Sequence, residues 1–401
     1  MVPSDESEPR IGVNVRAARR SRGMSLETLA GLTGRSKGWL SKIENGRARL
    51  ERRQDIAAIA EALEVSADSL VGAPAPEIQP HTRAYNFRPL RAALLDATID
   101  DPRDTPARSV TVLADLTVGQ DAALRRADYE TLTQQLPCLL DELQVQAATT
   151  TGAERDLALR SLIQACASAA TALKHFGLTD LAWVSADRGR HAAYLLGHPV
   201  WRAAAAFACA HASFAANKSR ALLSTPRHAD ELQPHIGDDP FAAEVYGMLH
   251  LSAALACAVQ GDHGGACAHG TEAAQVAEPL GDRPDAFEVF GPANVGVWLA
   301  SLAVDAGNAE EALTHADSVE PRHLASSNRR AALCLEKARA YAMLGKDSDA
   351  VREMRHAERL SPAQTHHHPL IRELVTDMLG RARREAGGRD LRGLAWRMNL
   401  I

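Results

Sequence analysis

Apolar residues recur every three or four positions along most of the chain, which is the spacing of the buried face of an α-helix. Five short helices are predicted near the N-terminus, at residues 11–22, 25–33, 36–45, 52–63 and 66–71. From about Tyr85 the helical pattern continues to the end of the chain, with long stretches at 120–149 and 154–176. Residues 109–118 alternate like a strand, but their leucine and alanine content favours a helix. The pattern predicts an all-α protein.

One stretch near the N-terminus, residues 26–45, has the spacing of two helices joined by a tight turn; it reads LETLAGLTGRSKGWLSKIEN. Ala30 is small where the two helices must cross closely, and Gly34 stands where the turn requires a positive φ. Leu40 and Ile43 lie on one face of the second helix and can pack against the first. This spacing predicts a helix-turn-helix that enters DNA.

Composition divides the chain into four parts. Residues 1–9 are acidic, contain proline and are expected to be disordered. Residues 10–71 form the predicted DNA-binding domain. Residues 72–84 include the sequence GAPAPEIQP and are predicted to be an extended linker. The linker leads into a helical domain at 85–401, and a chain of this length is expected to hold two or more domains.

Helix pairs repeat through the helical domain. The clearest copy is 331–362, where Ala338, Ala350 and Ala357 are small at positions of helix contact, Tyr341 fills the gap and Pro362 ends the unit. This copy resembles a tetratricopeptide repeat. Weaker copies of the turn read GLTDLA, NKSRA, GDHGGA and GNAEEA, and the alanines that end the copies are Ala182, Ala221, Ala266, Ala312 and Ala350. We predict five stacked units that form an α-solenoid. An irregular α-domain without stacking is the alternative.

Charge is unevenly distributed. Residues 10–53 hold twelve lysines and arginines and three glutamates, a local charge of +9 in a chain with a net charge of −5. Only this N-terminal end is therefore expected to bind a polyanion.

Residues 10–71 resemble the Xre/Cro family of phage-repressor-type helix-turn-helix domains, through IGVNVRAARRSRGMSLETLAGLTG, LSKIENGRARL and IAAIAEALEVSADSL. The resemblance implies a five-helix domain that binds double-stranded DNA and an internal Arg19–Glu44 ion pair. It implies base contacts by Lys37, Gly38, Ser41 and Lys42. The phosphate contacts that we predict are those of Ser25, Ser36, Trp39, Asn45, Arg47 and Arg49, although Trp39 can instead cover the small core and the arginine run can be a solvated face.

Two positions depart from the common family pattern. Leu26 replaces a frequent glutamine, and Gly38 offers no side chain for base reading. Fewer direct base contacts make specificity depend more on the spacing of a dimer and on the deformability of DNA.

In a solenoid the first helix of each pair builds the inner wall. The side chains predicted there are a mixture of apolar, aromatic and polar groups, which suits a peptide or a moderately hydrophobic small molecule. Asn294 and Trp298 lie one turn apart and can act together. For each residue, ordinary packing is the alternative. The predicted ligand-binding residues are Gln164, Thr171, His175, Phe207, Phe214, Met248, Ser252, Asn294, Trp298, Ser301 and Arg339.

Other chemistry is not expected. The six cysteines show no metal or redox spacing and are predicted to be reduced and buried. The run 366–368, three histidines in a predicted loop without a carboxylate or cysteine at ligand spacing, does not predict a metal site. No catalytic motif indicates an enzyme or a cofactor. With no signal core at the N-terminus and no apolar run of about 18 residues, we expect a cytoplasmic protein that does not contact membranes.

Together these features resemble peptide-pheromone-sensing regulators and the Xre-repeat regulators of actinobacteria. The resemblance implies a sequence-specific transcription regulator that dimerises through its helical domain and responds to a peptide or small-molecule effector. The alternative is a scaffold whose helical domain binds a partner protein while the helix-turn-helix only localises it to DNA.

Overall fold

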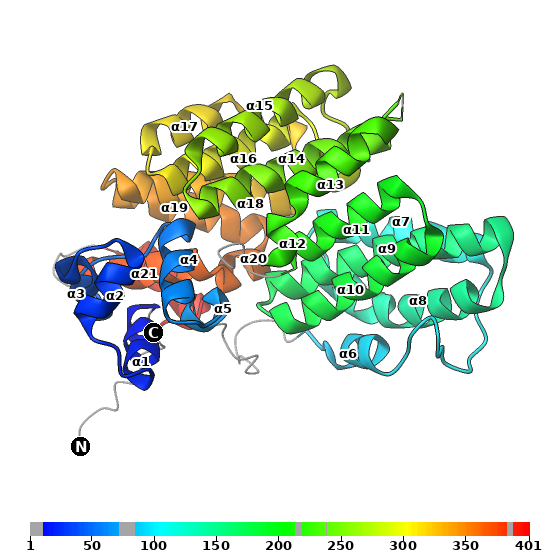
Figure 1. The fold of residues 1–401 in the computed structure, drawn as a ribbon, viewed down its shortest axis with the longest axis horizontal. Helices are drawn as coiled ribbons and strands as arrows, with labels where there is room; N and C mark the ends of the chain where they lie inside the picture. Colours follow the sequence, from blue (N-terminus) through cyan, green and yellow to red (C-terminus); the bar gives the residue numbers. More distant parts are fainter. Residues whose placement is uncertain (1–10, 72–84, 213–218, 238, 383–387) are drawn as a thin grey trace.

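The computed structural model describes the chain outside five gaps (Figure 1). Its described residues are 11–71, 85–212, 219–237, 239–382 and 388–401. Within these ranges every regular element is a helix, which confirms the predicted all-α fold. The predicted disordered segment 1–9, the linker 72–84 and Phe214 lie outside the described residues.

The N-terminal domain has five helices, each within about two residues of its predicted position. They are α1 (Ile11–Ser21), α2 (Leu26–Thr33), α3 (Lys37–Glu44), α4 (Arg53–Ala62) and α5 (Ala67–Val71). Ser25 and Ser36 cap α2 and α3, because each hydroxyl accepts a hydrogen bond from a backbone N–H three residues later. Gly34 ends α2 at φ 63°, as the turn requires. Leu29, Leu40 and other apolar side chains of these helices share one buried core.

The helical domain begins with α6 (Arg88–Leu95), α7 (Val110–Arg125), α8 (Tyr129–Thr149), α9 (Gly152–His175), α10 (Thr179–Leu196), α11 (Pro199–His211), α12 (Arg220–Leu223) and α13 (Thr225–Leu232). It continues with α14 (Pro240–Gln260), α15 (His263–Leu280), α16 (Pro292–Ala306), α17 (Ala309–Ser318), α18 (Ser327–Met343), α19 (Asp347–Leu360), α20 (Pro362–His367), α21 (Pro369–Ala382) and α22 (Arg389–Arg397). The helix predicted at 109–118 is therefore α7. The stretch 120–149 is not one helix, because the chain turns between α7 and α8 at Ala127, which has φ 57°.

Four helix pairs share one turn geometry. The pairs are α9–α10, α14–α15, α16–α17 and α18–α19, and each turn has a glycine at φ between 73° and 90°: Gly177, Gly261, Gly307 and Gly345. In each turn the N–H after the glycine donates to a carbonyl five residues earlier, which closes the end of the first helix. The turn also brings the second helix back along the first, so the helices stack as antiparallel pairs.

The recurring alanines mark these pairs with one exception. Ala182, Ala266, Ala312 and Ala350 are buried in the second helix of a pair. Ala221 instead lies in the four-residue helix α12, α11 packs against both α12 and α13, and residues 217 and 218 of the predicted NKSRA turn lie outside the described residues. Four regular pairs and one irregular pair are consistent with a solenoid, whereas membership of the tetratricopeptide class stays a prediction.

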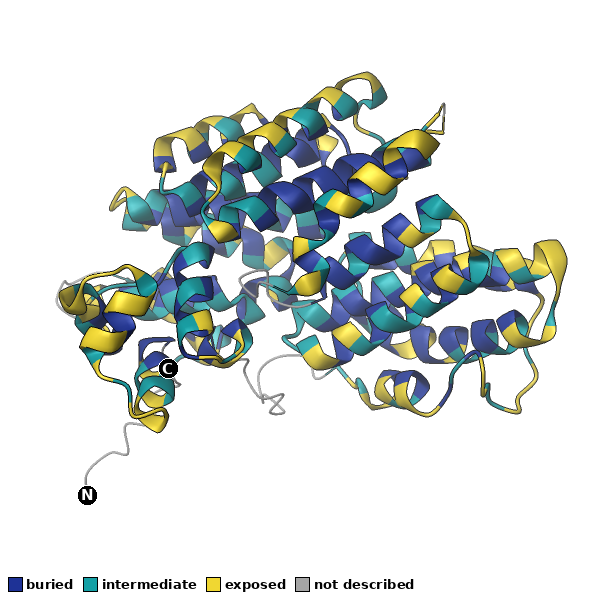
Figure 2. Cartoon of the chain, viewed as in Figure 1, coloured by how far each residue is buried: buried dark blue, intermediate teal, exposed yellow. Residues whose placement is uncertain are grey.

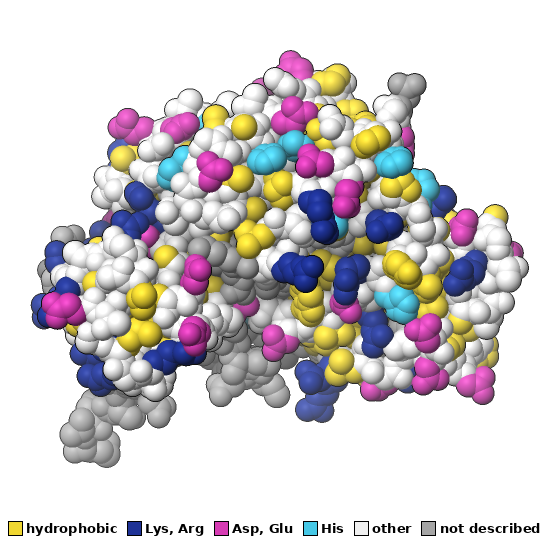
Figure 3. All heavy atoms as spheres, viewed as in Figure 1, with side chains coloured by type: hydrophobic (Ala, Val, Ile, Leu, Met, Phe, Trp, Pro, Cys, Tyr) yellow, Lys and Arg dark blue, Asp and Glu magenta, His cyan; other side chains and the backbone are white. Residues whose placement is uncertain are grey.

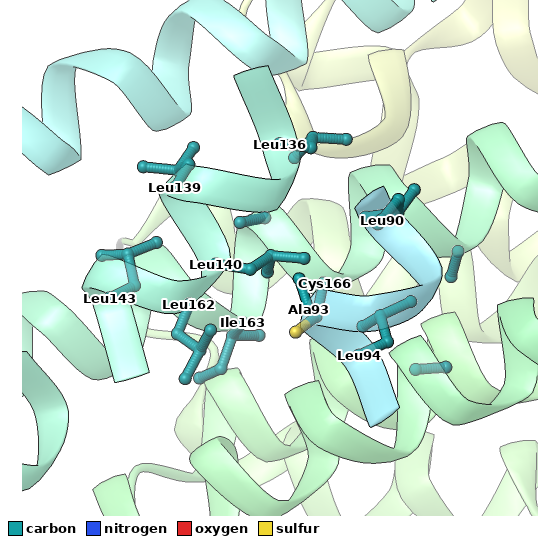
Figure 4. Packing of buried hydrophobic residues seen from close by; sticks show 14 of the residues in the cluster. Leu90, Ala93, Leu94, Leu136, Leu139, Leu140, Leu143, Leu162, Ile163 and Cys166 are labelled. Atoms are coloured by element: carbon teal, nitrogen blue, oxygen red, sulfur yellow. The ribbon is translucent and has the colours of Figure 1, made fainter. Parts of the chain in front are cut away.

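The core of the helical domain starts between α6, α8 and α9. Leu90, Leu94, Leu136, Leu140 and Ile163 belong to one buried cluster in this region (Figure 4). Such leucine-rich contacts fix the first pairs in place, and buried positions then follow the inner faces of the later helices (Figure 2).

The helix stack curves so that its C-terminal part returns to the N-terminal domain (Figure 1). Leu370 of α21 joins the core of that domain. Ala57 of α4 packs with Leu255, Ala256 and Val259 of α14. The N-terminal domain is therefore docked on the helical domain through α4 and α21.

Two expectations from composition need correction: that all six cysteines are buried, and that no apolar run is long enough to cross a membrane. Cys138 and Cys267 are exposed and Cys257 is half-buried, although all six cysteines are free thiols. Helix α14 is apolar and long enough to cross a membrane by length and composition, with a mean hydropathy of 1.4 over its best window. In the fold 83% of that window is buried, as in the central helix of a packed domain.

Candidate DNA interface and ligand cavity

The predicted recognition helix α3 presents its base-reading positions outward. Lys37, Gly38 and Lys42 are exposed and Ser41 is half-buried. Gly38 faces open space, since a Cβ there would meet no atom within 4 Å. Lys37 pairs with Glu27 at 3.2 Å, but both side chains are largely exposed and such a pair exchanges readily for phosphate or base.

The predicted phosphate contacts surround this helix. Ser25, Ser36, Asn45 and Arg47 are exposed. Trp39 is half-buried against the core of the domain, and its backbone N–H donates to the Ser36 hydroxyl. The Arg35 guanidinium lies 5.5 Å from the centre of the Trp39 ring and also binds Asp55. Trp39 thus covers part of the core, and its phosphate contact stays a prediction.

The predicted Arg19–Glu44 ion pair is present and ties α1 to α3. Nε of Arg19 donates to Oε1 of Glu44 at 2.6 Å, and Nη2 donates to Oε2 at 2.8 Å. Nη1 donates to the Met24 carbonyl at 2.7 Å. The hydrogen bond to Glu44 outweighs burial and raises the pKa of Arg19. Arg19 therefore positions the recognition helix and is not available to DNA.

The arginines that follow the recognition helix divide between solvent and the helical domain. Arg47 is exposed, whereas Arg49 pairs with Glu51 and lies 3.6 Å from Asp377 of α21. Arg49 therefore already serves an ion pair at the domain contact, and its phosphate contact stays a prediction. Arg53 is likewise turned inward.

A buried cluster of four charges holds the N-terminal domain in its docked position. Arg53 of α4 binds Asp305 of α16, and Arg339 of α18 donates to Asp305 at 2.8 Å and to Glu336 at 2.7 Å. Arg339 also reaches the Glu51 carbonyl at 3.2 Å. We call Arg53, Asp305, Glu336 and Arg339 the interdomain cluster. Burial alone would raise the pKa of Glu336, but the charges of Arg339 and Arg53 hold it below its usual value.

Beside this cluster lies a cavity of about 290 Å³. Its wall comes mainly from α7, α9, α11, α14, α16, α18 and α20 of the helical domain, and Arg53, Asp68 and Val71 of the N-terminal domain complete it. Seven of the eleven predicted ligand-binding residues line this one cavity: Thr171, His175, Phe207, Met248, Asn294, Trp298 and Ser301. The structure therefore brings most of the predicted inner wall together.

The other predicted wall residues lie elsewhere. Gln164 is exposed, because it lies two turns before Thr171 on α9, beyond the end of the cavity. Ser252 is buried behind the wall, where it donates to the Met248 carbonyl and bonds Nε2 of His211 at 2.8 Å. Arg339 belongs to the interdomain cluster.

The charged residues of the cavity were missed by the sequence analysis, among them Lys174, Glu288 and Arg329. The side chains of these three residues make no hydrogen bond or ion pair with the part of the chain that the structure describes, while Arg329 lies 5.7 Å from the centre of the Trp298 ring. Burial lowers the pKa of Lys174 to about 8 and that of Arg329 to about 10. A signal existed for Lys174, which follows Thr171 by three residues and shares its helix face.

Several buried polar atoms at the cavity also have no hydrogen-bond partner among the described residues. They are Nε1 of Trp298, Oδ1 of Asn294, Nε of Arg329, Oε1 of Gln364 and Nδ1 of His368. Buried polar atoms are normally satisfied, so a group of orphans around one cavity indicates a place where a ligand or water supplies the partners. Glu288 in the same wall has a φ of 50°, a strained backbone conformation for a residue other than glycine. Such strain clusters at binding and active sites.

The histidines of the run 366–368 do not share one environment. His366 and His367 belong to α20 rather than to a loop, and His366 bonds Glu358 at 2.7 Å, a carboxylate that the sequence spacing did not reveal. His368 faces the cavity, where burial lowers its pKa to about 3.

Another group, Cys334, Glu353 and His356, has potential metal-ligand atoms within 4.8 Å of one another. Burial raises the pKa of the Cys334 thiol to about 12, which disfavours the thiolate that a metal requires.

A second hollow of about 1040 Å³ lies over α10, α11 and α13, and we call it the surface groove. Arg190, Arg202, Arg220 and Arg227 line it together with Trp183 and Tyr194. Figure 3 shows these helices carrying a group of basic side chains apart from those of the N-terminal domain. Sequence analysis did not single out this groove, because its arginines are dispersed over 38 positions of an otherwise mixed-charge region.

Comparison with known proteins identifies the N-terminal domain. Residues 10–71 match the family model described as a helix-turn-helix domain. The comparisons with curated proteins and with solved structures gave no match. The chain therefore carries a helix-turn-helix domain of the kind that DNA-binding regulators use, joined to a helical domain.

Proposed function

We propose that this protein is a sequence-specific transcription regulator of the Xre/Cro type, and that a ligand in the cavity sets its affinity for DNA. The observation that carries the proposal is the shared wall of the cavity. Arg53 on α4 and Asp68 and Val71 on α5 belong to the DNA-binding domain, and they line the same cavity as Asn294 and Trp298.

This geometry gives a ligand a direct route to the DNA-binding domain. A molecule that contacts residues of both domains in the cavity has one affinity for the docked arrangement of the protein. It has a different affinity for an arrangement in which α4 and α5 have moved. Its differential affinity for the two arrangements is the free energy with which it can shift them. In a cytoplasmic homodimer, which we also propose, the two recognition helices would meet half-sites about 34 Å apart, so a shift of either domain alters the fit.

The sequence-specific part of the proposal is tested with the full chain on DNA. We expect Lys42→Ala to weaken binding to the DNA upstream of its own gene by about tenfold or more, since one bidentate base contact contributes roughly 1–3 kcal/mol of discrimination. The same variant should change binding to random DNA much less. Arg47→Ala should weaken binding to both DNAs alike, because it removes a phosphate contact. Fluorescence anisotropy at several salt concentrations measures both effects, and equal affinity for all DNA in the wild type would refute sequence-specific regulation.

The surface groove favours a second function, a scaffold that binds a partner protein. Trp183 and Tyr194 are 41% and 73% exposed there, which is unusual for large aromatic side chains without a partner. For a scaffold, Trp183→Ala and Tyr194→Ala would abolish capture of the partner, and changes in the cavity would leave DNA binding unaltered. For the ligand-controlled regulator, the cavity variants alter DNA binding and the two groove variants do not.

A further inference from the structure

The strongest unexplained feature of the cavity is a pair of buried cations that form no ion pair with the described residues. Lys174 and Arg329 both line it, and the described structure gives neither side chain a carboxylate partner. We propose that the ligand is a small organic anion, with a carboxylate or similar acidic group on a flat apolar body, held by Lys174 and Arg329. This inference rests on the proposed function, in which the cavity is the effector site.

The other charged groups around the cavity form no direct ion pair with these two cations. Asp121 binds Arg125 at 2.7 Å, and the interdomain cluster is neutral as a set. Asp68 already has an interaction within the fold. Glu288 remains: burial raises its pKa while the charges of Arg329 and Lys174 act in the opposite direction, and its carboxylate makes no ion pair with either cation among the described residues. The histidines at the wall, His175, His211, His367 and His368, are kept neutral by burial, which lowers the pKa of each.

A cation deprived of water and of a counter-ion is costly, so an anion that enters the cavity gains strongly from pairing with it. Lys174 supplies a point charge with three donors, and Arg329 supplies a planar fork that can bind a carboxylate through two hydrogen bonds.

The rest of the wall indicates the body of the ligand. The Trp298 ring forms one face, with Arg329 near it and the His211 ring edge-on at 5.4 Å. Phe207 lies tilted against His211, with ring centroids 4.5 Å apart, and continues the aromatic surface. Nε1 of Trp298 and Oδ1 of Asn294 offer one donor and one acceptor. A volume of about 290 Å³ lies at the lower end of small-molecule sites and favours a compact molecule over a peptide of several residues.

Two fluorescent probes of nearly the same shape test the charge preference. 1-Anilinonaphthalene-8-sulfonate carries an acidic group, and N-phenyl-1-naphthylamine is the same ring system without it. With the purified full chain, we expect the sulfonate to bind at least about tenfold more tightly than the neutral probe, as charge-assisted hydrogen bonds require. Lys174→Met and Arg329→Met should each remove most of this preference and leave the neutral probe within about twofold, because the cavity keeps its apolar wall.

The controls separate a specific site from general adhesion and from misfolding. Arg202→Met removes an arginine of the surface groove and should not change the affinity for the sulfonate. Arg329→Lys keeps the charge and should retain a preference for the anion. Unaltered binding of the neutral probe shows that Lys174→Met is folded. Equal binding of the two probes by the wild type, or loss of sulfonate binding in Arg202→Met instead of Lys174→Met, overturns the proposal.

DNA binding measured with each probe present separates this inference from the proposed function. If the sulfonate is preferred through Lys174 but DNA affinity does not respond, the anion site stands and ligand control fails. If the neutral probe is preferred and DNA affinity responds, ligand control stands and the anion site fails.

Discussion

The interdomain cluster makes a quantitative prediction about how the DNA-binding domain is held. Its four side chains, Arg53, Asp305, Glu336 and Arg339, are only 5–8% exposed and sum to zero charge. Asp305→Asn leaves one uncompensated positive charge, and Arg53→Met leaves one uncompensated negative charge. Removing one partner of a buried ion pair costs about 3–5 kcal/mol.

The double variant restores neutrality, because Arg339 and Glu336 then remain as a pair at 2.7 Å. Asp305→Asn together with Arg53→Met should therefore cost less than the sum of the single variants, with a coupling energy of roughly 2 kcal/mol or more. It should also be more stable than Asp305→Asn alone, although it lacks one more hydrogen-bonding side chain.

Hydrogen exchange measured by mass spectrometry is the suitable assay, since it reports the opening free energy of α1–α5 separately from that of the helical domain. The matched control is the exposed pair Arg352 and Asp349 on α19, whose removal should not change the exchange of α1–α5. Additive costs for Arg53→Met and Asp305→Asn would refute the idea that the cluster acts as one neutral unit across the domain contact.

Two predictions concern pH. Burial alone would raise the pKa of Glu358, but hydrogen bonds from His366 and Arg397 hold it at about 2. The stabilisation by this carboxylate is therefore present above the unfolded-state pKa and is lost as pH falls from about 5 toward 2. In denaturant titrations, Glu358→Gln should lose less stability than the wild type over this pH range. Burial lowers the pKa of Lys174 to about 8, so between about pH 8 and 10 the unfolded chain binds more protons and stability rises with pH. Lys174→Met should lack that rise, and a rise of equal size in the variant would contradict the buried position of the ammonium group.

The N-terminal domain could be predicted closely from the sequence because its determinants are local. Serine caps, the turn glycine at 34 and apolar residues spaced by three or four positions fix five helices within one short segment. The Arg19–Glu44 pair followed from the resemblance, since a family pattern carries a contact between residues that are 25 positions apart.

The charge run after the recognition helix shows where such reasoning stops. Arg47, Arg49 and Arg53 belong to one arginine run, so the sequence pattern does not distinguish them. Arg47 is exposed, whereas Arg49 and Arg53 form ion pairs with acidic side chains at the domain contact. Their partners, Asp377 and Asp305, lie more than 250 positions away, and local spacing contains no information about how a solenoid curves back.

The cavity could be predicted only in part, because local spacing gives the face of each helix but not the packing of the two domains. Helical periodicity placed Thr171, Asn294 and Trp298 on inner faces, because each position depends only on its own helix. It did not find Glu288, which enters the wall from the strained turn before α16, or Val71, which enters from the other domain. A wall built from two domains requires their docked arrangement.

The most direct test of ligand control fills the cavity without adding a ligand. Thr171→Trp places a large ring in the shared cavity, and Arg202→Trp places the same ring in the surface groove as a control. With the full chain and the DNA upstream of its own gene, we expect Thr171→Trp to change the dissociation constant by about tenfold or more, which corresponds to roughly 1.4 kcal/mol of coupling. Arg202→Trp should leave it unchanged. A Thr171→Trp protein that is folded and binds this DNA as the wild type does would contradict control of DNA binding through the cavity.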